Sequence, residues 1–114
     1  MNIEDLRTYA LSKPDTEEGF PFGEETLVFK VKGKLFLLVS VYSQPLQFNL
    51  KCDPDRAVEL REEYDCIKPG YHMNKKHWNT IVPDRTISNA FLKELIDHSY
   101  ELVAKGKKAS KKAS

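Results

Sequence analysis

The chain has 114 residues and a mass of 13.2 kDa, the size of one domain with its own core. Hydrophobic residues make up 40% and charged residues 31%, with five glycines and six prolines, which excludes collagen-like, low-complexity and disulfide-scaffold proteins. The formal net charge is only +1. No apolar run approaches the roughly 20 residues of a membrane-spanning helix, no secretory signal follows Met1, and Cys52 and Cys66 fit no disulfide framework. We therefore expect a cytoplasmic protein without a membrane partner.

The small net charge hides an uneven distribution. Five of the 18 basic residues lie in residues 105–114, which contain no acid, so residues 1–104 carry 13 basic and 17 acidic groups. Within that body, residues 26–52 and 66–83 hold lysines but no carboxylate. If these two stretches share one surface, the domain has a positive side and a negative side. The alternative is that both stretches form strands, from which Asp and Glu are depleted in any case.

The chain opens with a helix and a loop. Apolar residues at helical spacing behind a cap at Asn2 predict a first helix over residues 2–12. Acids, glycines and a proline then predict an acidic surface loop over residues 15–25. Phe20 and Phe22 are expected to pin this loop to the core.

Three antiparallel strands are expected next, at residues 26–32, 35–41 and 46–51. The first and third alternate apolar and polar residues, a period of two that is typical of strands. The second is apolar on both faces, as a central strand would be. Gly33 supplies the turn between the first two.

A second helix is predicted from Asp53-Pro54, where a cap precedes a proline at the first helical position. Apolar residues continue at spacings of three and four as far as Ile67. Lys68-Pro69-Gly70 is expected to end this helix.

The last part of the chain is expected to hold two short strands and a helix. Residues 71–73 and 77–82 form two strands joined through residues 74–76, or else a loop that leads into one strand. Ser88 caps a final amphipathic helix, which ends near Lys105-Gly106. The stretch that follows has nothing to bury.

The expected order of elements is α-β-β-β-α-β-β-α. An antiparallel sheet that carries amphipathic helices on one side is a two-layer α+β domain. We expect residues 1–104 to form this single domain and the lysine-rich residues 105–114 to be disordered.

The densest polar segment is PGYHMNKKHWNT, residues 69–80. It holds two lysines, two histidines, two asparagines, a tyrosine and a tryptophan, and no acid. Lysines neutralise phosphates, asparagine amides bind phosphate or a base edge, and aromatic faces stack on bases. The segment therefore suits nucleic-acid contact, although Trp78, as the one tryptophan of a small domain, is expected in the core more than as a stacking platform.

This segment resembles the MmcQ/YjbR family of small bacterial proteins, as do NLKCDP at residues 49–54, FPFG at 20–23 and LIDHSYELV at 95–103. The resemblance covers residues 1–104. It implies a YjbR-like α+β fold, related to CyaY-like and secretion-chaperone architectures. It also implies DNA binding through a double-wing motif, and it carries over no catalytic residue and no cofactor.

The residues themselves suggest a physical form of two such wings. One hairpin tip is Lys32-Gly33-Lys34 and the other is Asn74-Lys75-Lys76, both in acid-free stretches. Wings of this kind contact the DNA backbone or enter a minor groove, so little sequence specificity is expected. The residues predicted to contact DNA are Lys30, Lys32, Lys34, Tyr71, His72, Asn74, Lys75, Lys76, His77 and Asn79.

Two kinds of chemical site compete with DNA binding. Cys52 precedes a helix start, where the pKa of a thiol can fall, and His72 or His77 would be its base; the alternative is an ordinary buried cysteine. The same histidines with a cysteine could bind a metal. However, two histidines five residues apart across a turn lack helical spacing, and no carboxylate lies nearby. We therefore predict neither enzyme activity nor a metal site.

A protein-interaction module is the stronger alternative. If Gly33 and Lys34 form a two-residue turn, the face that carries Lys30 and Lys32 also carries four apolar side chains, those of Leu35, Leu37, Val39 and Val41. A three-residue turn puts Phe36 and Leu38 there instead. Either register leaves large apolar groups on the sheet face away from the helices, which a second chain or a peptide could cover.

Overall fold

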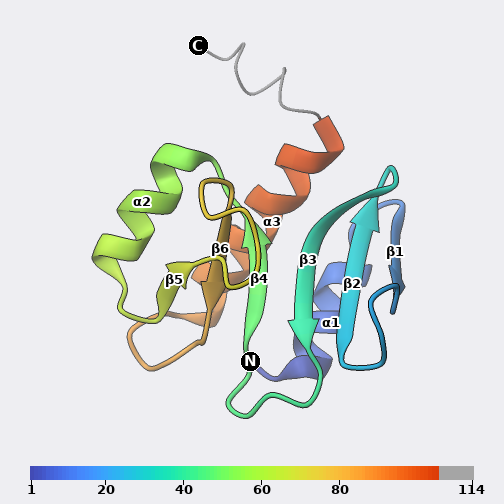
Figure 1. Ribbon diagram of the computed structural model, residues 1–114, viewed down its shortest axis with the longest axis horizontal. Coiled ribbons are helices and arrows are strands. Elements are labelled where there is room, and N and C mark those ends of the chain that lie inside the picture. Colours follow the sequence, from blue (N-terminus) through green and yellow to red (C-terminus); the bar gives the residue numbers. More distant parts are fainter. Residues whose placement is uncertain (106–114) are drawn as a thin grey trace.

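The computed structural model describes residues 1–105, which fold into three helices and one six-stranded antiparallel sheet (Figure 1). The strand order is β1-β2-β3-β4-β6-β5. The strands are β1 (Thr16–Gly19), β2 (Thr26–Val31), β3 (Lys34–Ser40), β4 (Phe48–Lys51), β5 (Ile67–Pro69) and β6 (Trp78–Ile81); the helices are α1 (Ile3–Leu11), α2 (Pro54–Glu63) and α3 (Asn89–Lys105). The predicted α+β class is confirmed. Beyond Lys105, the predicted disordered tail lies outside the described residues.

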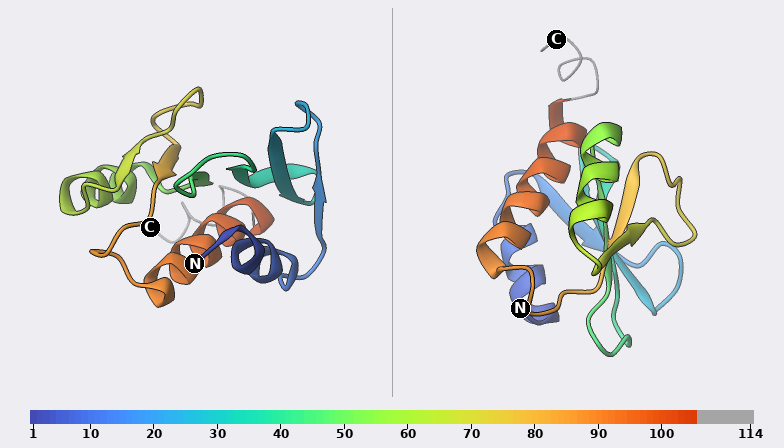
Figure 2. Two further views of the ribbon diagram at one scale, coloured as in Figure 1. Left: turned by 90° about the horizontal axis from the view of Figure 1, so that it is seen from below. Right: turned by 90° about the vertical axis from the view of Figure 1, so that its left-hand side faces the viewer.

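The sheet has one covered face and one open face. Helices α1 and α3 pack on one side, and α2 lies at the β5 edge (Figures 1 and 2). The opposite side, called the open face below, carries a cross-strand row made by Val28, Leu38, Asn49 and Thr80. Two loops, residues 20–25 and 70–77, rise from the open face on either side of it (Figure 2).

Side-chain caps set the start of each helix as the sequence predicts. Asn2 Oδ1 accepts from the backbone N–H of Asp5 at 2.8 Å, which starts α1. Asp53 Oδ2 accepts from Asp55 N and Arg56 N, both at 3.2 Å, and Pro54 is the first residue of α2. A serine hydroxyl, that of Ser88, caps α3. Each cap satisfies backbone donors that the first helical turn leaves without partners.

The core lies between the sheet and the helices. Phe29, Phe36 and Phe48 are fully buried there. Ser99 of α3 is also fully buried: its hydroxyl donates to the carbonyl of Phe36 at 2.5 Å and accepts from the N–H of Lys51 at 2.9 Å. These bonds satisfy backbone groups at the end of the sheet where β3 begins and β4 ends.

Three expectations about the elements are wrong. Residues 16–19 form β1, an edge strand paired with β2, inside the stretch predicted as a loop. Phe20 and Phe22 are 51% and 66% exposed, so they do not pin that stretch to the core. The second helix ends at Glu63, and residues 67–69, predicted as the helix end, form β5.

The β2–β3 register combines the two predicted alternatives. Val31 is opposite Lys34 across a two-residue turn, and Lys30 is opposite Leu35, as a two-residue turn requires. A bulge at this point then shifts the register, so that Val28 is opposite Leu38. The open face therefore carries Leu35 and Leu38 together, and the prediction of apolar side chains away from the helices is confirmed.

Candidate nucleic-acid interface

The β2–β3 turn consists of Lys32 and Gly33. Their φ angles are 54° and 77°, so both lie in the left-handed region that a type I′ hairpin turn needs. Lys32 is exposed at the tip. Lys34 is exposed too, but it lies opposite the core residue Val31, so its side chain leaves the sheet on the helix side.

The loop of residues 70–77 joins β5 to β6 and is held by side-chain acceptors. Asn74 Oδ1 accepts from Lys76 N at 2.9 Å and from His77 N at 3.3 Å. Tyr71 N donates to Thr80 Oγ1 at 2.8 Å, so the loop is also tied to the open face. Of the two predicted alternatives, the loop that leads into one strand is observed, because residues 71–73 form no strand and β6 begins at Trp78. The strand that pairs with β6 across this loop is β5, at residues 67–69.

Gly70 allows the loop to approach β6. A Cβ atom at this position would lie 2.8 Å from Trp78 Cβ and 3.0 Å from Met73 Cβ, closer than real Cβ contacts. The N–H of Gly70 donates to the carbonyl of Trp78 at 2.8 Å. Glycine is therefore required where the chain leaves β5.

Arg61 of α2 anchors the other side of the loop. Its Nε donates to Asn79 Oδ1 at 2.7 Å, and its Nη2 donates to the carbonyls of Lys75 and Trp78. One guanidinium thus bridges a helix, a strand and the loop, which is the fork geometry that arginine suits. Sequence reasoning missed Arg61, because nothing in the chain indicates that α2 faces residues 75–79.

The structure divides the ten predicted DNA contacts into two groups. The exposed side chains are Lys32, Lys34, Tyr71, His72, Asn74, Lys75 and Lys76, while Lys30 and His77 are half-buried and Asn79 is buried. Asn79 faces the core, where it accepts from Arg61 and donates to the carbonyl of Ala57 at 3.4 Å. Because Asn79 is 2% exposed, its prediction as a DNA contact is wrong.

Three further predicted contacts lie beside groups of the same chain. Lys30 lies directly opposite Glu17 of β1, so a carboxylate sits on the neighbouring strand. The amide oxygen of Asn74 is occupied by the two backbone donors of its own loop. The Lys75 ammonium donates to the carbonyl of Gly70 at 3.1 Å but stays exposed.

The two lysine-bearing turns lie at the same end of the sheet (Figure 1). Neighbouring strands are antiparallel, so the end of β2, the start of β3, the end of β4 and the start of β6 all meet there. Three strand spacings of about 4.8 Å separate the two hairpins, roughly 14 Å. The last turn of α3 and Lys105 lie at this end as well (Figure 1).

Acids lie at both ends of the sheet. Glu24 and Glu25 precede β2 and Asp84 follows β6, so the strand directions place them far from both turns. Several acids lie at the lysine end too: Asp53 caps α2, Asp15 precedes β1, Glu17 is opposite Lys30, and Glu101 pairs with Lys105. The lysine end is therefore positive but not free of carboxylates.

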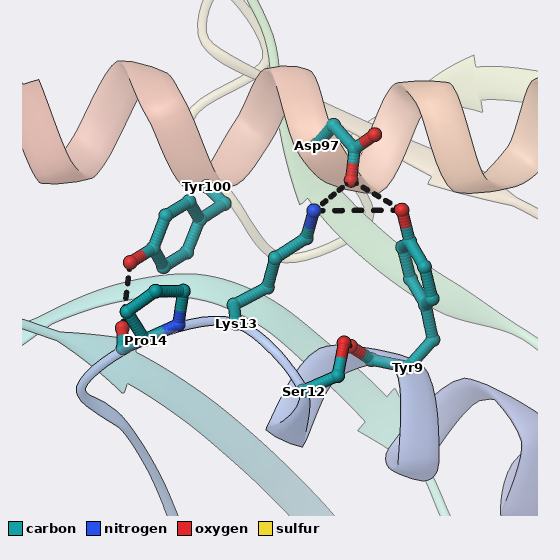
Figure 3. Close-up of polar contacts among 6 residues, drawn as sticks. All are labelled: Tyr9, Ser12, Lys13, Pro14, Asp97 and Tyr100. Atoms are coloured by element: carbon teal, nitrogen blue, oxygen red, sulfur yellow. Dashed lines mark hydrogen bonds and ion pairs between the residues drawn. The ribbon is translucent and has the colours of Figure 1, made fainter.

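The cluster of Tyr9, Lys13 and Asp97 joins the end of α1 to α3 (Figure 3). Tyr9 Oη donates to Asp97 at 2.6 Å, and the Lys13 ammonium forms an ion pair with the same carboxylate. The hydrogen bond to Asp97 raises the pKa of Tyr9. Burial lowers the pKa of Lys13, but Asp97 and Tyr9 outweigh it and the net pKa is raised. Both groups hold their protons, so the cluster is suited to structure and not to proton transfer.

The candidate thiol is not activated. Cys52 is buried in the core, and burial raises the pKa of its thiol to about 11. A helix N-terminus lowers a thiol pKa only when the thiolate is not desolvated, and here desolvation dominates. Within residues 1–105, no three His, Cys, Asp or Glu side chains lie close enough to hold a metal ion.

Comparison with known proteins matches residues 11–102 to the YjbR family model. The chain belongs to the YjbR family. The uncharacterized protein YbdF of Escherichia coli O157:H7 is 45% identical over 103 residues, which cover 90% of this chain and 84% of YbdF. Uncharacterized protein YjbR of E. coli K12 is 30% identical over 101 residues, covering 89% of this chain and 86% of YjbR. The family resemblance seen in the sequence is thus confirmed.

Solved structures of similar proteins share the fold. A Deinococcus radiodurans protein with the domain named DUF419 is 43% identical, with a TM-score of 0.88 over 93% of this chain and 80% of that one. A Pseudomonas syringae protein is 26% identical, with a TM-score of 0.76 over 90% of this chain and 99% of that one. The YjbR fold therefore includes all three helices and the six-stranded sheet described for residues 1–105. None of these helices has both the length and the apolar character to cross a bilayer.

Proposed function

We propose that this YjbR-family protein is a binding protein for duplex DNA that contacts the phosphate backbone through the β2–β3 turn and the loop of residues 70–77. The observation that carries the proposal is the position of both turns at one end of the sheet, roughly 14 Å apart by strand spacing. Exposed ammonium groups at both turns can then contact one duplex. The groups are those of Lys32, Lys34, Lys75 and Lys76.

The expected binding is weak and depends strongly on salt. Each phosphate that a lysine neutralises contributes about −0.9 to the slope of log K against log salt concentration, so four contacts give a slope of about −3 to −4. Because ammonium groups on turns contact phosphates and not base edges, affinity should vary little with sequence. The carboxylates at the opposite end of the sheet repel DNA, so the complex has one orientation.

A salt titration with matched variants tests the proposal. Fluorescence anisotropy would measure binding of the full chain and of residues 1–105 to a duplex at several salt concentrations. The variants Lys32→Asn and Lys76→Gln should each reduce the slope by about 1. Asn-Gly is a favoured type I′ dipeptide, so Lys32→Asn removes the charge and keeps the turn.

Arg85→Gln is the matched control, because it removes one exposed positive charge after β6, at the far end of the sheet. It should leave the slope unchanged. Equal slopes for all variants, or binding by the full chain that residues 1–105 lack entirely, would contradict the proposed interface.

A further inference from the structure

The open face holds a groove between its two raised loops. Its volume is about 430 Å³, within the range of small-molecule and single-base sites. The loop of residues 20–25 contributes Phe22, and the loop of residues 70–77 contributes Tyr71, His72 and Met73. Figure 2 shows both loops rising on the side opposite α1 and α3.

The walls of the groove carry exposed aromatic rings. Phe22 is 66% exposed and Tyr71 is 62% exposed, so neither ring contributes to the core. The Tyr71 and His72 ring centroids lie 4.0 Å apart. Two aromatic walls over a hydrophobic floor formed by Leu35 and Leu38 fit a flat, unsaturated ligand.

The floor also presents an oriented hydrogen-bond donor. Tyr71 N donates to Thr80 Oγ1, and the Thr80 hydroxyl donates to Asn49 Oδ1. In this network the Asn49 amide oxygen faces the Thr80 hydroxyl. The amide nitrogen has no hydrogen-bond partner among residues 1–105, so it is available to a ligand in the groove, which Asn49 lines. Such a positioned amide can donate to a carbonyl or ring nitrogen of a base.

The charges around the groove are asymmetric. No Asp, Glu, Lys or Arg side chain lines it, but Lys75 and Lys76 lie on the loop of one wall, and Glu24 and Glu25 lie on the loop of the other. A ligand with an anionic backbone and neutral rings matches this arrangement. Its phosphates would follow the lysine wall, and its rings would point across the floor toward Phe22.

We propose that the groove binds an unpaired base of single-stranded DNA, with Tyr71 as the stacking platform and Asn49 as the donor. The inference deepens the proposed function and rests on it, because the same loop of residues 70–77 supplies the backbone contacts. An extended peptide is the competing occupant. Peptides that add to sheets gain affinity by pairing with a strand edge, whereas this groove lies over the face of the central strands, whose backbone groups are already paired.

The test compares two single strands of equal length and charge, an oligothymidine and the corresponding abasic strand. Trp78 reports occupancy, since it is the tryptophan of the chain and packs beside Leu38 and Met73 under the groove. Anisotropy and Trp78 quenching would be measured with the full chain. Stacking of one base is worth about 1–3 kcal/mol, so we expect about tenfold tighter binding of the oligothymidine.

Matched aromatic variants identify the groove. Tyr71→Ala should remove most of the tenfold preference and leave affinity for the abasic strand unchanged, and Tyr71→Phe should retain it. Tyr42→Ala is the control, because Tyr42 is 72% exposed and does not line the groove. A preference that Tyr71→Ala leaves intact would overturn the assignment of the groove.

The remaining outcomes separate this inference from the proposed function. Equal, salt-dependent affinity for both strands would leave backbone binding standing and refute the base site. Absence of binding at low salt to these strands would refute the base site, and absence of binding to the duplex as well would refute both proposals. Quenching of Trp78 by a short Leu–Ser peptide, with none by oligothymidine, would assign the groove to peptides instead.

Discussion

Replacing Arg61 tests whether α2 holds the loop of residues 70–77 in place. The Arg61→Ala variant removes the bond to Asn79 Oδ1 at 2.7 Å and both bonds to the carbonyls of Lys75 and Trp78. Hydrogen bonds to a charged group are worth about 1.5–3 kcal/mol, and the Asn79 oxygen, in a residue 2% exposed, is then left without a donor. We therefore expect a loss of about 2–3 kcal/mol in the free energy of unfolding, or about 10–20 °C in Tm.

Urea denaturation followed by Trp78 fluorescence measures this loss. Arg56→Ala is the matched control on the same helix, because Arg56 forms only a surface ion pair with Glu94 at 3.1 Å, and such pairs contribute at most about 1 kcal/mol. Combining Arg61→Met with Asn79→Leu should recover part of the loss, since both polar partners are removed together. If Arg61→Ala costs no more than Arg56→Ala, the anchoring role of Arg61 is refuted.

Three further predictions concern other positions. Burial, followed by the charge of Arg56, lowers the pKa of His98, whose Nε2 accepts from Asp53 N at 3.2 Å. The unfolded chain therefore binds the proton more readily, and the free energy of unfolding should fall as pH drops below about 6.5. His98→Gln should diminish this loss, which urea midpoints at pH 7.5 and 5.5 would measure. With a thiol pKa of about 11, Cys52 should react with iodoacetamide at pH 8 about a hundredfold more slowly in the folded than in the unfolded chain, as mass spectrometry would record. Gly70→Ala should destabilise the domain by more than about 1 kcal/mol, because the new methyl group meets Trp78 Cβ at 2.8 Å. Gly19→Ala is the control, since a Cβ atom there meets nothing within 4 Å, and equal thermal melts for the two variants would contradict the close approach.

Local sequence patterns correctly predicted the elements whose caps or periodicity lie within their own residues. The caps at Asn2, Asp53 and Ser88 and the period of two at residues 26–31 were readable because each acts over a few residues. The acidic strand β1 gave no such signal, since pairing with β2 stabilises it and that partner lies elsewhere in the chain.

The end of α2 was mispredicted because apolar spacing continued past it. Tyr64 and Ile67 keep a helical spacing, yet Tyr64 adopts extended angles of −122° and 119°, and Ile67 enters β5. No glycine or proline lies between Glu63 and Ile67 to mark the change. Only the pairing of β5 with β6 decides that residues 67–69 form a strand and do not continue the helix.

The site shows the same division between local and tertiary information. Both lysine turns were recognisable, because turn residues flanked by lysines are local features. The burial of Asn79 was not, since its partner Arg61 is 18 residues away on a helix whose facing was unknown. The groove was also hidden, because it needs two loops from opposite parts of the sheet.

Under the proposed function, strand direction matters more than net charge for the side from which DNA would approach this domain. Residues 1–104 carry an excess of four acids, which taken as a sum predicts repulsion. Because the strands alternate in direction, turns that follow β2 and precede β6 meet at one end, and Glu24, Glu25 and Asp84 lie at the other. The net charge of residues 1–104 therefore describes neither end of the sheet. Reversing charge at the acidic end should change affinity only slightly at physiological salt, where the Debye length is about 8 Å, whereas the same change at Lys76 should abolish a contact.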